Sequence, residues 1–325
     1  MISISSGATA RRVKALVLIT ILGLIWGLHF SIVKIAGSSG MQLGGTVAAT
    51  SLGSMLVFVV ICRLRRKMPV MRRQAVFYYL ACALVGYTVP FFLELYSAPR
   101  IGAGILTIVV CLTPLSTVIL AVLLKSDTVN KLKLVAIMLG LISVAPLVLS
   151  NAASPAYGWG LLAAFGVPVA YAAYHNIVAK YWPFEQDSWQ VAAGEALALC
   201  VVVVPIYVAV DGFRLPASNW TGAEWTILLM VAFSTLEIYL YFEIVRVSGA
   251  IFVSQANFVT VPTGVVWGMV LFGEQHSSWI YFSVVILAIS LILAARATNA
   301  AEEDSSGRPA ARPSGDQVGS NQSVI

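Results

Sequence analysis

Charged side chains are scarce in this chain of 325 residues. Asp, Glu, Lys and Arg make up 10% of the sequence, whereas hydrophobic residues make up 59%. Soluble domains carry about 25% charged residues, so this composition excludes an ordinary soluble domain and indicates a membrane protein. The net charge of +6 does not indicate nucleic-acid binding, because the basic residues fall in short loops between apolar runs rather than on one exposed face.

Residues that carry covalent or metal chemistry are also few. The four cysteines lie far apart, within or beside apolar runs, and form neither a C-x-x-C pair nor a metal-ligand spacing. The sequence contains no G-x-x-x-x-G-K-[ST] phosphate loop, no G-x-S-x-G and no H-E-x-x-H. We therefore expect no ATP-driven pump, no enzyme, no metal site and no cofactor.

Long hydrophobic runs, in contrast, are abundant. A helix needs about 20 apolar residues to cross a bilayer, and the run 248–274 has Glu274 as its only ionisable residue. The run that begins at Ala15 is longer than a signal-peptide core, so we interpret it as a retained first helix. The predicted crossings are 15–36, 43–62, 75–98, 101–124, 132–150, 157–180, 188–210, 223–246, 249–272 and 277–296.

The basic residues predict the orientation of these ten crossings. With the N-terminus in the cytoplasm, 17 Lys and Arg lie on the cytoplasmic side and 3 on the other, namely Lys34, Arg100 and Arg214. Cytoplasmic loops are enriched in Lys and Arg. The sequence thus predicts a multi-pass protein of the cell (inner) membrane with both termini cytoplasmic, flanked by a cytoplasmic tail at 1–14 and a disordered cytoplasmic tail at 297–325.

Two halves of five crossings can be aligned with each other. At an offset of 148 positions Pro114 coincides with Pro262, and at an offset of 145 Ser31-Ile32-Val33 falls on Asn176-Ile177-Val178. Because five is odd, the second half enters the membrane from the opposite side, which is the inverted-repeat plan of many transporters. We predict an all-α membrane protein of ten transmembrane helices in two inverted five-helix repeats, 15–150 and 157–296.

An ordered set of short motifs supports this plan. It comprises Trp26-Gly27, Gly102-Ala103, Pro114, Tyr241-Phe242, Ser248-Gly249-Ala250, Pro262 and Gly273-Glu274. On these residues the chain resembles the EamA-type transporters of the drug/metabolite transporter superfamily across nearly all of 15–296. It departs from that family at Lys125-Ser126, where the fourth helix of such a repeat usually closes with Gly-Glu. The resemblance implies alternating access and transport of small metabolites, often amino acids or drug-like compounds.

Ionisable residues within the crossings are the candidate functional residues, because burying them in lipid is costly. We predict that Glu237 lines a central cavity, where it either recognises a cationic group or takes up a proton. Lys34 and Glu94 lie at similar depth and are predicted to form a buried ion pair, and the kinks at Pro114 and Pro262 are predicted hinges. The predicted cavity residues are Trp26, His29, Tyr87, His175, Asn176, Glu237, Tyr241, Asn257 and Trp267.

The function predicted from these features is a secondary carrier. Its substrate is expected to be a small organic metabolite such as an amino acid, moved by export, with the lipid bilayer and the substrate as its partners and protons as a candidate coupling ion. A sugar or nucleotide-sugar carrier on the same plan is the alternative within the class. From other classes, a membrane-embedded enzyme acting on lipids and a non-transporting receptor remain open, while the oligomeric state is not specified.

Overall fold

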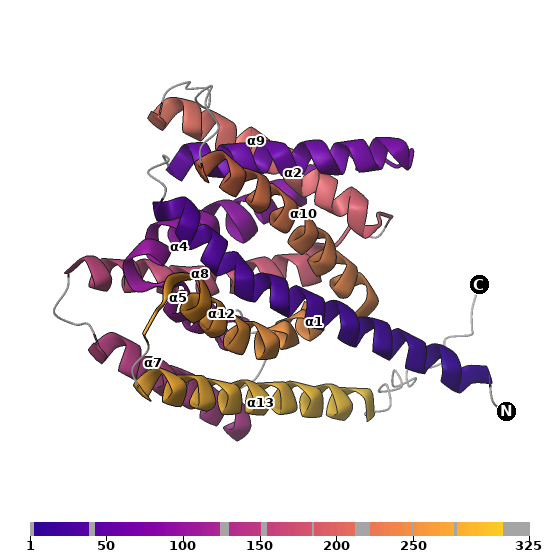
Figure 1. The fold of residues 1–325 in the computed structure, drawn as a ribbon. Coiled ribbons are helices and arrows are strands. Elements are labelled where there is room, and N and C mark those ends of the chain that lie inside the picture. The colour runs from indigo at the N-terminus through magenta and orange to yellow at the C-terminus, as the bar shows by residue number, and fades with distance from the viewer. Residues whose placement is uncertain are drawn as a thin grey trace, which may run out of the picture.

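Every element that the computed structural model describes is helical. It describes residues 3–38, 43–123, 130–150, 155–183, 185–211, 222–248, 250–275 and 278–307 (Figure 1). The first half contains α1 (Ser3–Ser38), α2 (Leu43–Leu64), α3 (Arg73–Ala81), the π-helical segment η1 (Cys82–Thr88), α4 (Val89–Ile101), α5 (Ala103–Val110), α6 (Thr113–Leu123) and α7 (Lys131–Ser150). The second half contains α8 (Pro155–Tyr181), α9 (Ser188–Asp211), α10 (Gly222–Ser248), α11 (Ala250–Val253), the 3-10 turn η2 (Ser254–Ala256), α12 (Asn257–Phe272) and α13 (Ser278–Gly307).

The predicted crossings and the observed helices correspond segment by segment. Within the described residues seven helices are long and apolar enough to span a membrane, and two shorter apolar helices cover 257–272 and 278–294. Large apolar side chains such as Val201, Leu162 and Val270 are more than half exposed on the outside of the bundle, as expected for side chains that face lipid. The predicted class, an all-α multi-pass membrane protein, is confirmed.

The neighbours of each helix repeat between the two halves. Three pairs join a helix to its own counterpart: α2 packs on α9, α5 on α12, and α7 on α13, and the last of these pairs lies along one edge of the molecule in Figure 1. The first helix of each half behaves alike, since α1 packs on α12 and α10 while α8 packs on α5, α6 and α4. These pairings match when the halves are exchanged, as expected for two equivalent repeats, although α1 also packs on α4 of its own half whereas α8 packs on α10 at most weakly.

Three helical segments near the centre are interrupted. The third crossing changes from α3 through the π-helical η1 to α4, and π-turns inside helices are often found at functional sites. The fourth is broken at Cys111-Leu112, directly before Pro114, and the carbonyl of Val110, which Pro114 cannot pair, accepts a hydrogen bond from the Thr113 hydroxyl at 2.6 Å. The ninth is broken at η2, ahead of Pro262.

The helix ends differ from two predicted boundaries. Helix α1 begins at Ser3, within the predicted tail 1–14, and α13 continues to Gly307, beyond the boundary expected at 296. Residues 308–325 of the predicted tail lie outside the described part of the chain, as do Lys125, Ser126 and Arg214.

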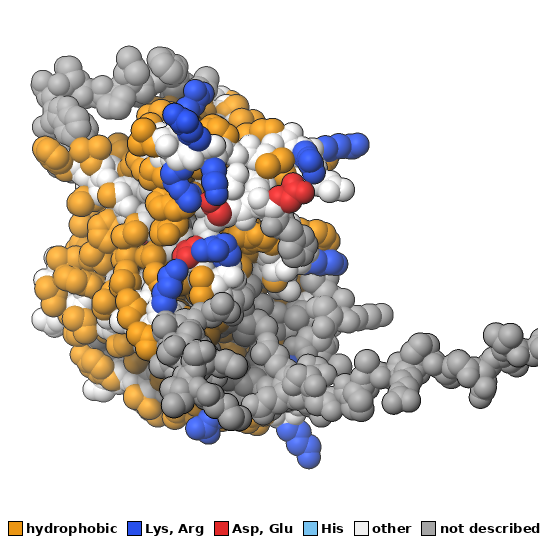
Figure 2. All heavy atoms as spheres, turned by 90° about the vertical axis from the view of Figure 1, so that its right-hand side faces the viewer, with side chains coloured by type: hydrophobic (Ala, Val, Ile, Leu, Met, Phe, Trp, Pro, Cys, Tyr) orange, Lys and Arg blue, Asp and Glu red, His pale blue; other side chains and the backbone are white. Residues whose placement is uncertain are grey.

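Basic side chains gather at one end of the bundle. The face toward which the N-terminal end of α1 points, shown in Figure 2, carries clustered Lys and Arg side chains beside a largely apolar flank. Ion pairs at this end include Arg65 with Asp187 and Lys14 with Glu243, both joining the two halves. We call this the Lys14 end. The opposite end of α1, which lies about 30 Å away at about 1.5 Å per residue, is the Lys34 end.

Candidate functional site

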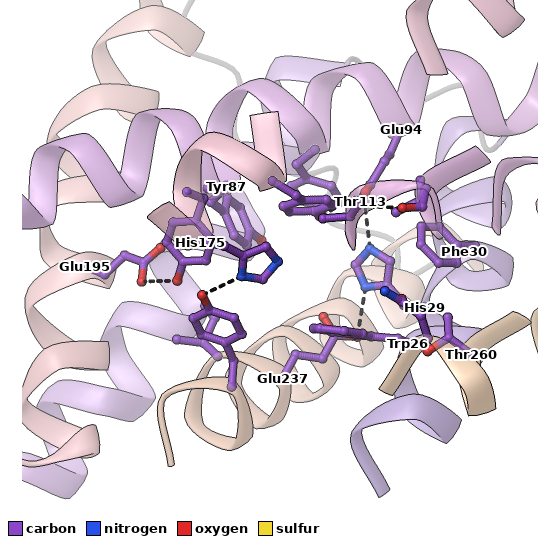
Figure 3. A pocket seen from close by; sticks show the side chains of 18 residues that line it. Trp26, His29, Phe30, Tyr87, Glu94, Thr113, His175, Glu195, Glu237 and Thr260 are labelled. Carbon is purple, nitrogen blue, oxygen red and sulfur yellow. Dashed lines mark hydrogen bonds and ion pairs between the residues drawn. The ribbon is translucent and has the colours of Figure 1, made fainter. Parts of the chain in front are cut away.

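A cavity of about 100 Å³ lies at the centre of the bundle between the two halves. This is room for several water molecules or a small solute, because one water needs about 10–15 Å³. Figure 3 shows its side chains converging from both halves. The lining residues are Trp26, His29, Phe30, Gly86, Tyr87, Phe91, Glu94, Val110, Thr113, Tyr171, Tyr174, His175, Glu195, Glu237, Ile238, Tyr241, Asn257 and Thr260.

His29 bridges two buried carboxylates on one side of the cavity. Its Nε2 lies 3.2 Å from Glu94 Oε2, and its Nδ1 lies 3.0 Å from Glu237 Oε1. The second oxygen of Glu94, Oε1, accepts a hydrogen bond from the Tyr171 hydroxyl at 2.9 Å. Four helices, α1, α4, α8 and α10, thus supply one side chain each to a single ionic cluster, which we call the His29 cluster.

Close helix crossings hold His29 in this position. A Cβ on Gly23 would lie 2.6 Å from Val259 Cβ, and a Cβ on Gly27 would lie 2.9 Å from the backbone nitrogen of Gly264. Small residues at such crossings let helix backbones approach closely in membranes. Because Gly23 and Gly27 share the face of α1 that packs on α12, Trp26 and His29 are turned toward the cavity.

An aromatic cluster with a third acid forms the other side of the cavity. The Tyr174 hydroxyl donates to Glu195 Oε2 at 3.2 Å, and the Tyr241 hydroxyl lies 2.8 Å from His175 Nδ1. The rings of Tyr174 and Tyr241 stack with centroids 5.1 Å apart. Gly86, in η1, is in contact with the Tyr174 ring, where any side chain would clash.

The Lys34 end is closed by one carboxylate. Glu274 Oε1 lies 2.5 Å from Lys34 Nζ and also accepts the backbone N–H of Ala103 at 2.9 Å, while Oε2 accepts that of Gly104 at 3.3 Å. Burial by itself raises the pKa of Glu274, but the Lys34 ammonium and the two amides outweigh it and hold the pKa below its ordinary value. The contact ties α1 and α5 of the first half to the end of α12.

A different ion pair links the two halves at the Lys14 end. Glu243 binds Lys14 at 3.0 Å and Arg246 at 2.8 Å, and its second oxygen accepts the Ser188 hydroxyl at 2.9 Å. The local pair between Glu243 and Arg246 was expected from their spacing of three on one helix. The cavity therefore lies between two ion pairs, each of which links the two halves.

The structure brings most of the predicted cavity residues together. Trp26, His29, Tyr87, His175, Glu237, Tyr241 and Asn257 all line the cavity. Asn176 does not line it and instead donates to the Ala172 carbonyl at 2.8 Å in its own helix. Trp267 also lies outside the lining, two helical turns beyond Thr260.

The predicted ion pair between Lys34 and Glu94 does not form. Lys34 pairs with Glu274, and Glu94 pairs with His29. The prediction used depth alone, but Lys34 is rotated by about 140° around α1 from His29 at about 100° per residue, so the two side chains meet different helices.

Several lining residues were not predicted to lie in the cavity. They include Glu94, which was predicted to pair with Lys34, the third acid Glu195, and the tyrosines Tyr171 and Tyr174. The available signal was the presence of acids within apolar runs, which indicates an interior position. It does not indicate which acids share one cavity.

Comparison with known proteins agrees with this architecture. The model of the EamA-like transporter family matches residues 13–149. A solved structure titled "Crystal structure of protein" superposes with a TM-score of 0.62 at 16% sequence identity, covering 88% of this chain and 99% of that one, which shows a shared fold. No curated protein matches the chain. The resemblance inferred from the residues is thus confirmed over the first repeat of this multi-pass membrane protein, where residues 13–149 match the EamA-like transporter family.

Proposed function

We propose that this protein is a secondary carrier that moves a small organic solute across the membrane by alternating access. The observation that carries this proposal is the central cavity, because both halves line it and an ion pair links the halves toward each end. Opening one pair at a time would expose the cavity to one side of the membrane and then to the other, as inverted repeats do in other carriers.

The substrate we propose is a small metabolite of the amino-acid kind, and export is the direction that the family resemblance favours. The sugar and nucleotide-sugar alternative would need cationic groups for phosphate or a ring of free polar groups for hydroxyls. Among the described lining residues the cavity contains neither Lys nor Arg, and its walls are largely aromatic.

We also propose that protons couple to transport through the His29 cluster. Two carboxylates and one imidazole within hydrogen-bonding distance can share protons, and a solute that binds a carboxylate competes with them. The protein would lie in the cytoplasmic membrane with the Lys14 end inside, which the excess of Lys and Arg in the loops at that end supports.

Counterflow in liposomes tests the carrier. Purified protein is reconstituted, the vesicles are loaded with unlabelled solute, and uptake of labelled amino acids, amines, sugars and nucleosides is followed with and without a pH gradient. Accelerated exchange of at least one solute is expected, and the rate should respond to the gradient. If no solute of any class exchanges faster than in empty liposomes, the carrier proposal is wrong.

A further inference from the structure

Negative charge exceeds positive charge in the cavity. Three carboxylates line it, Glu94, Glu195 and Glu237, and among the described lining residues no Lys or Arg accompanies them. His29 can neutralise at most one of them even as an imidazolium. Burying like charges without compensation is unfavourable, so the cavity is built to receive either protons or a cation.

One carboxylate oxygen in the cavity lacks a hydrogen-bond donor. Glu237 Oε1 is buried and has no hydrogen-bond partner among the described residues, although it lies 3.0 Å from His29 Nδ1 in an ion pair. A buried carboxylate oxygen without a donor is costly. Both carboxylate oxygens of Glu94, by comparison, have a partner: Oε2 lies 3.2 Å from His29 Nε2, and Oε1 accepts a hydrogen bond from the Tyr171 hydroxyl. A ligand that donates a hydrogen bond to Glu237 Oε1 would therefore supply the partner that this oxygen lacks.

Apart from uncharged donors such as the Trp26 indole N–H and the Asn257 amide, the described lining residues offer little to a ligand's carboxylate, because they include neither Lys nor Arg. Both ring nitrogens of His29 face acids, so its positive charge is not free for another anion. Five lining hydroxyl groups donate to protein acceptors: Tyr87 to Ser234, Tyr171 to Glu94, Tyr174 to Glu195, Thr113 to Val110 and Thr260 to Ala256. A zwitterion would thus bury its carboxylate against acids without a counter-charge.

Aromatic rings make up much of the remaining wall. Trp26 lies beside Glu237 and His29 in Figure 3, and Phe30, Tyr87 and Phe91 complete this side of the cavity. Aromatic faces attract cations and accept apolar groups. The same surface would thus suit both the charged head and the body of an organic amine.

We propose that the solute of this carrier is a primary amine with an apolar or aromatic body and no carboxylate, whose ammonium group donates to Glu237 Oε1. The inference rests on the proposed carrier function and revises its substrate from an amino acid to the corresponding amine, because the carboxylate of the amino acid would face the acids of the cavity. The N–H donors of a primary ammonium complete the unpartnered oxygen, and its charge offsets the excess of acids. Transport would therefore separate amines from amino acids that carry the same side chain.

Ligand binding to the purified full-length protein tests the charge requirement directly. Phenethylamine, phenylalanine and 3-phenylpropionate share a phenyl ring and differ in their charged groups, so their affinities, measured by titration calorimetry at pH 7, isolate the effect of charge. Saturable binding of phenethylamine is expected, with phenylalanine at least about tenfold weaker and no binding of 3-phenylpropionate. Binding of phenylalanine or 3-phenylpropionate as tightly as phenethylamine would overturn the inference, and this comparison needs no variant.

A matched pair of variants tests the position of the amine. Glu237→Gln keeps the side-chain volume and is expected to weaken phenethylamine binding about 10- to 100-fold, since a hydrogen bond to a charged group is lost. Glu185→Gln makes the same charge change at the exposed pair with Arg72 and should leave affinity unchanged. An unaltered affinity in Glu237→Gln, or an equal loss in Glu195→Gln, would refute the assignment to Glu237.

Counterflow separates this inference from the carrier proposal. Phenethylamine that binds but does not exchange across liposomes would support the amine site and refute the carrier. Exchange of a zwitterion or an anion across liposomes, without any binding of phenethylamine, would support the carrier and refute the amine site. Rapid exchange of phenethylamine that Glu237→Gln slows and Glu185→Gln does not is the result expected when both hold.

Discussion

Neutralising Glu274 should loosen the Lys34 end of the molecule. Helix α12 ends at Gly273, whose positive φ of 61° is a left-handed conformation that glycine adopts readily. This turn places the next residue, Glu274, against the start of α5, where Gly102 has φ 88° and a Cβ would lie 2.9 Å from Glu274 Oε1. Gly102 and Gly268, on which a Cβ would lie 2.9 Å and 2.5 Å from the two carboxylate oxygens, keep this place open. The substitution to test must therefore keep the side-chain volume: Glu274→Gln.

The expected loss of stability follows from the three donors that hydrogen-bond to the Glu274 carboxylate, namely the Lys34 ammonium and the backbone N–H groups of Ala103 and Gly104. Gln accepts through one oxygen only, and its NH₂ group would face either an amide N–H or the Lys34 ammonium, both of which are donors. At least one charge-assisted hydrogen bond, about 1.5–3 kcal/mol, is lost, and Lys34 is left largely buried without a counter-charge. We expect the free energy of unfolding to fall by about 3 kcal/mol.

The pH dependence of the free energy of unfolding is an independent test of the Glu274 contact. Burial opposes ionisation of Glu274, but Lys34 and the amides outweigh it, so its pKa is lower in the folded protein than in the unfolded chain. Its stabilising contribution is therefore complete above the unfolded value of about 4.3 and is lost as the pH falls through the folded-state pKa. The wild-type protein should lose more stability than Glu274→Gln when the pH is lowered from 6 to 3.

Equilibrium unfolding in mixed micelles, followed by far-UV circular dichroism, measures both effects. Lys34→Met and the double variant complete a thermodynamic cycle, in which the double variant should cost at least about 1 kcal/mol less than the two single variants summed. Single-variant losses that simply add, or a Glu274→Gln protein as stable as the wild type at pH 7, would show that this contact does not hold the Lys34 end closed.

The helix crossings, the Lys14 end and the orientation can each be tested separately. Gly27→Ala places a methyl group 2.9 Å from a backbone nitrogen of α12 and should lower the free energy of unfolding by about 1–3 kcal/mol in the same assay. Gly158→Ala, where the added methyl group has nothing within 4 Å, should change the free energy of unfolding by less than about 0.5 kcal/mol. Equal losses in the two variants would contradict a close crossing of α1 and α12. Glu243→Gln should destabilise the protein by about 1–2 kcal/mol, and by more than Lys14→Ala, because Glu243 is buried and pairs with both Lys14 and Arg246 whereas Lys14 is half exposed. A larger loss for Lys14→Ala would show that Glu243 is not the main contact between the halves at the Lys14 end. Arg66→Cys should react with a membrane-impermeant maleimide in inside-out vesicles and not in intact cells, and labelling of intact cells would reverse the proposed orientation.

The helical plan could be predicted because it depends on composition along the chain. Apolar runs of bilayer length and turn-forming residues between them fix the number and limits of the crossings, and every predicted segment is helical in the structure. The same information fixes depth, which is why Trp26, His29 and Glu237 could be assigned to a central cavity before their neighbours were known.

The hydrogen bonds and ion pairs around the cavity could not be predicted, because they depend on how each helix is rotated about its own axis. Asn176 follows His175 by about 100°, which is enough to turn its amide back to its own helix. Glu94 and Lys34 share a depth but face different neighbours, and Glu94 meets His29 only because α1 and α4 pack together. The π-helical η1, which shifts the register of the third crossing, likewise has no signature in the pattern of apolar residues.

The two ends of the molecule are closed by chemistry that the repeats do not share. At the offset that superposes Pro114 on Pro262, the position of Glu274 corresponds to Ser126 in the first half. In the carrier that we propose, exchanging the conformations of the two halves converts one access state into the other. That exchange would need a carboxylate at Ser126 to form an equivalent of the contact with Lys34 and the amides of α5, and a serine cannot supply it. The two access states must therefore differ in free energy, and the state closed at the Lys34 end gains the Glu274 contact. The Lys14–Glu243 pair opposes this bias only weakly, because Lys14 is half exposed. An empty carrier would therefore present its cavity toward the Lys14 end, where, in the proposed orientation, a solute leaving the cytoplasm would enter.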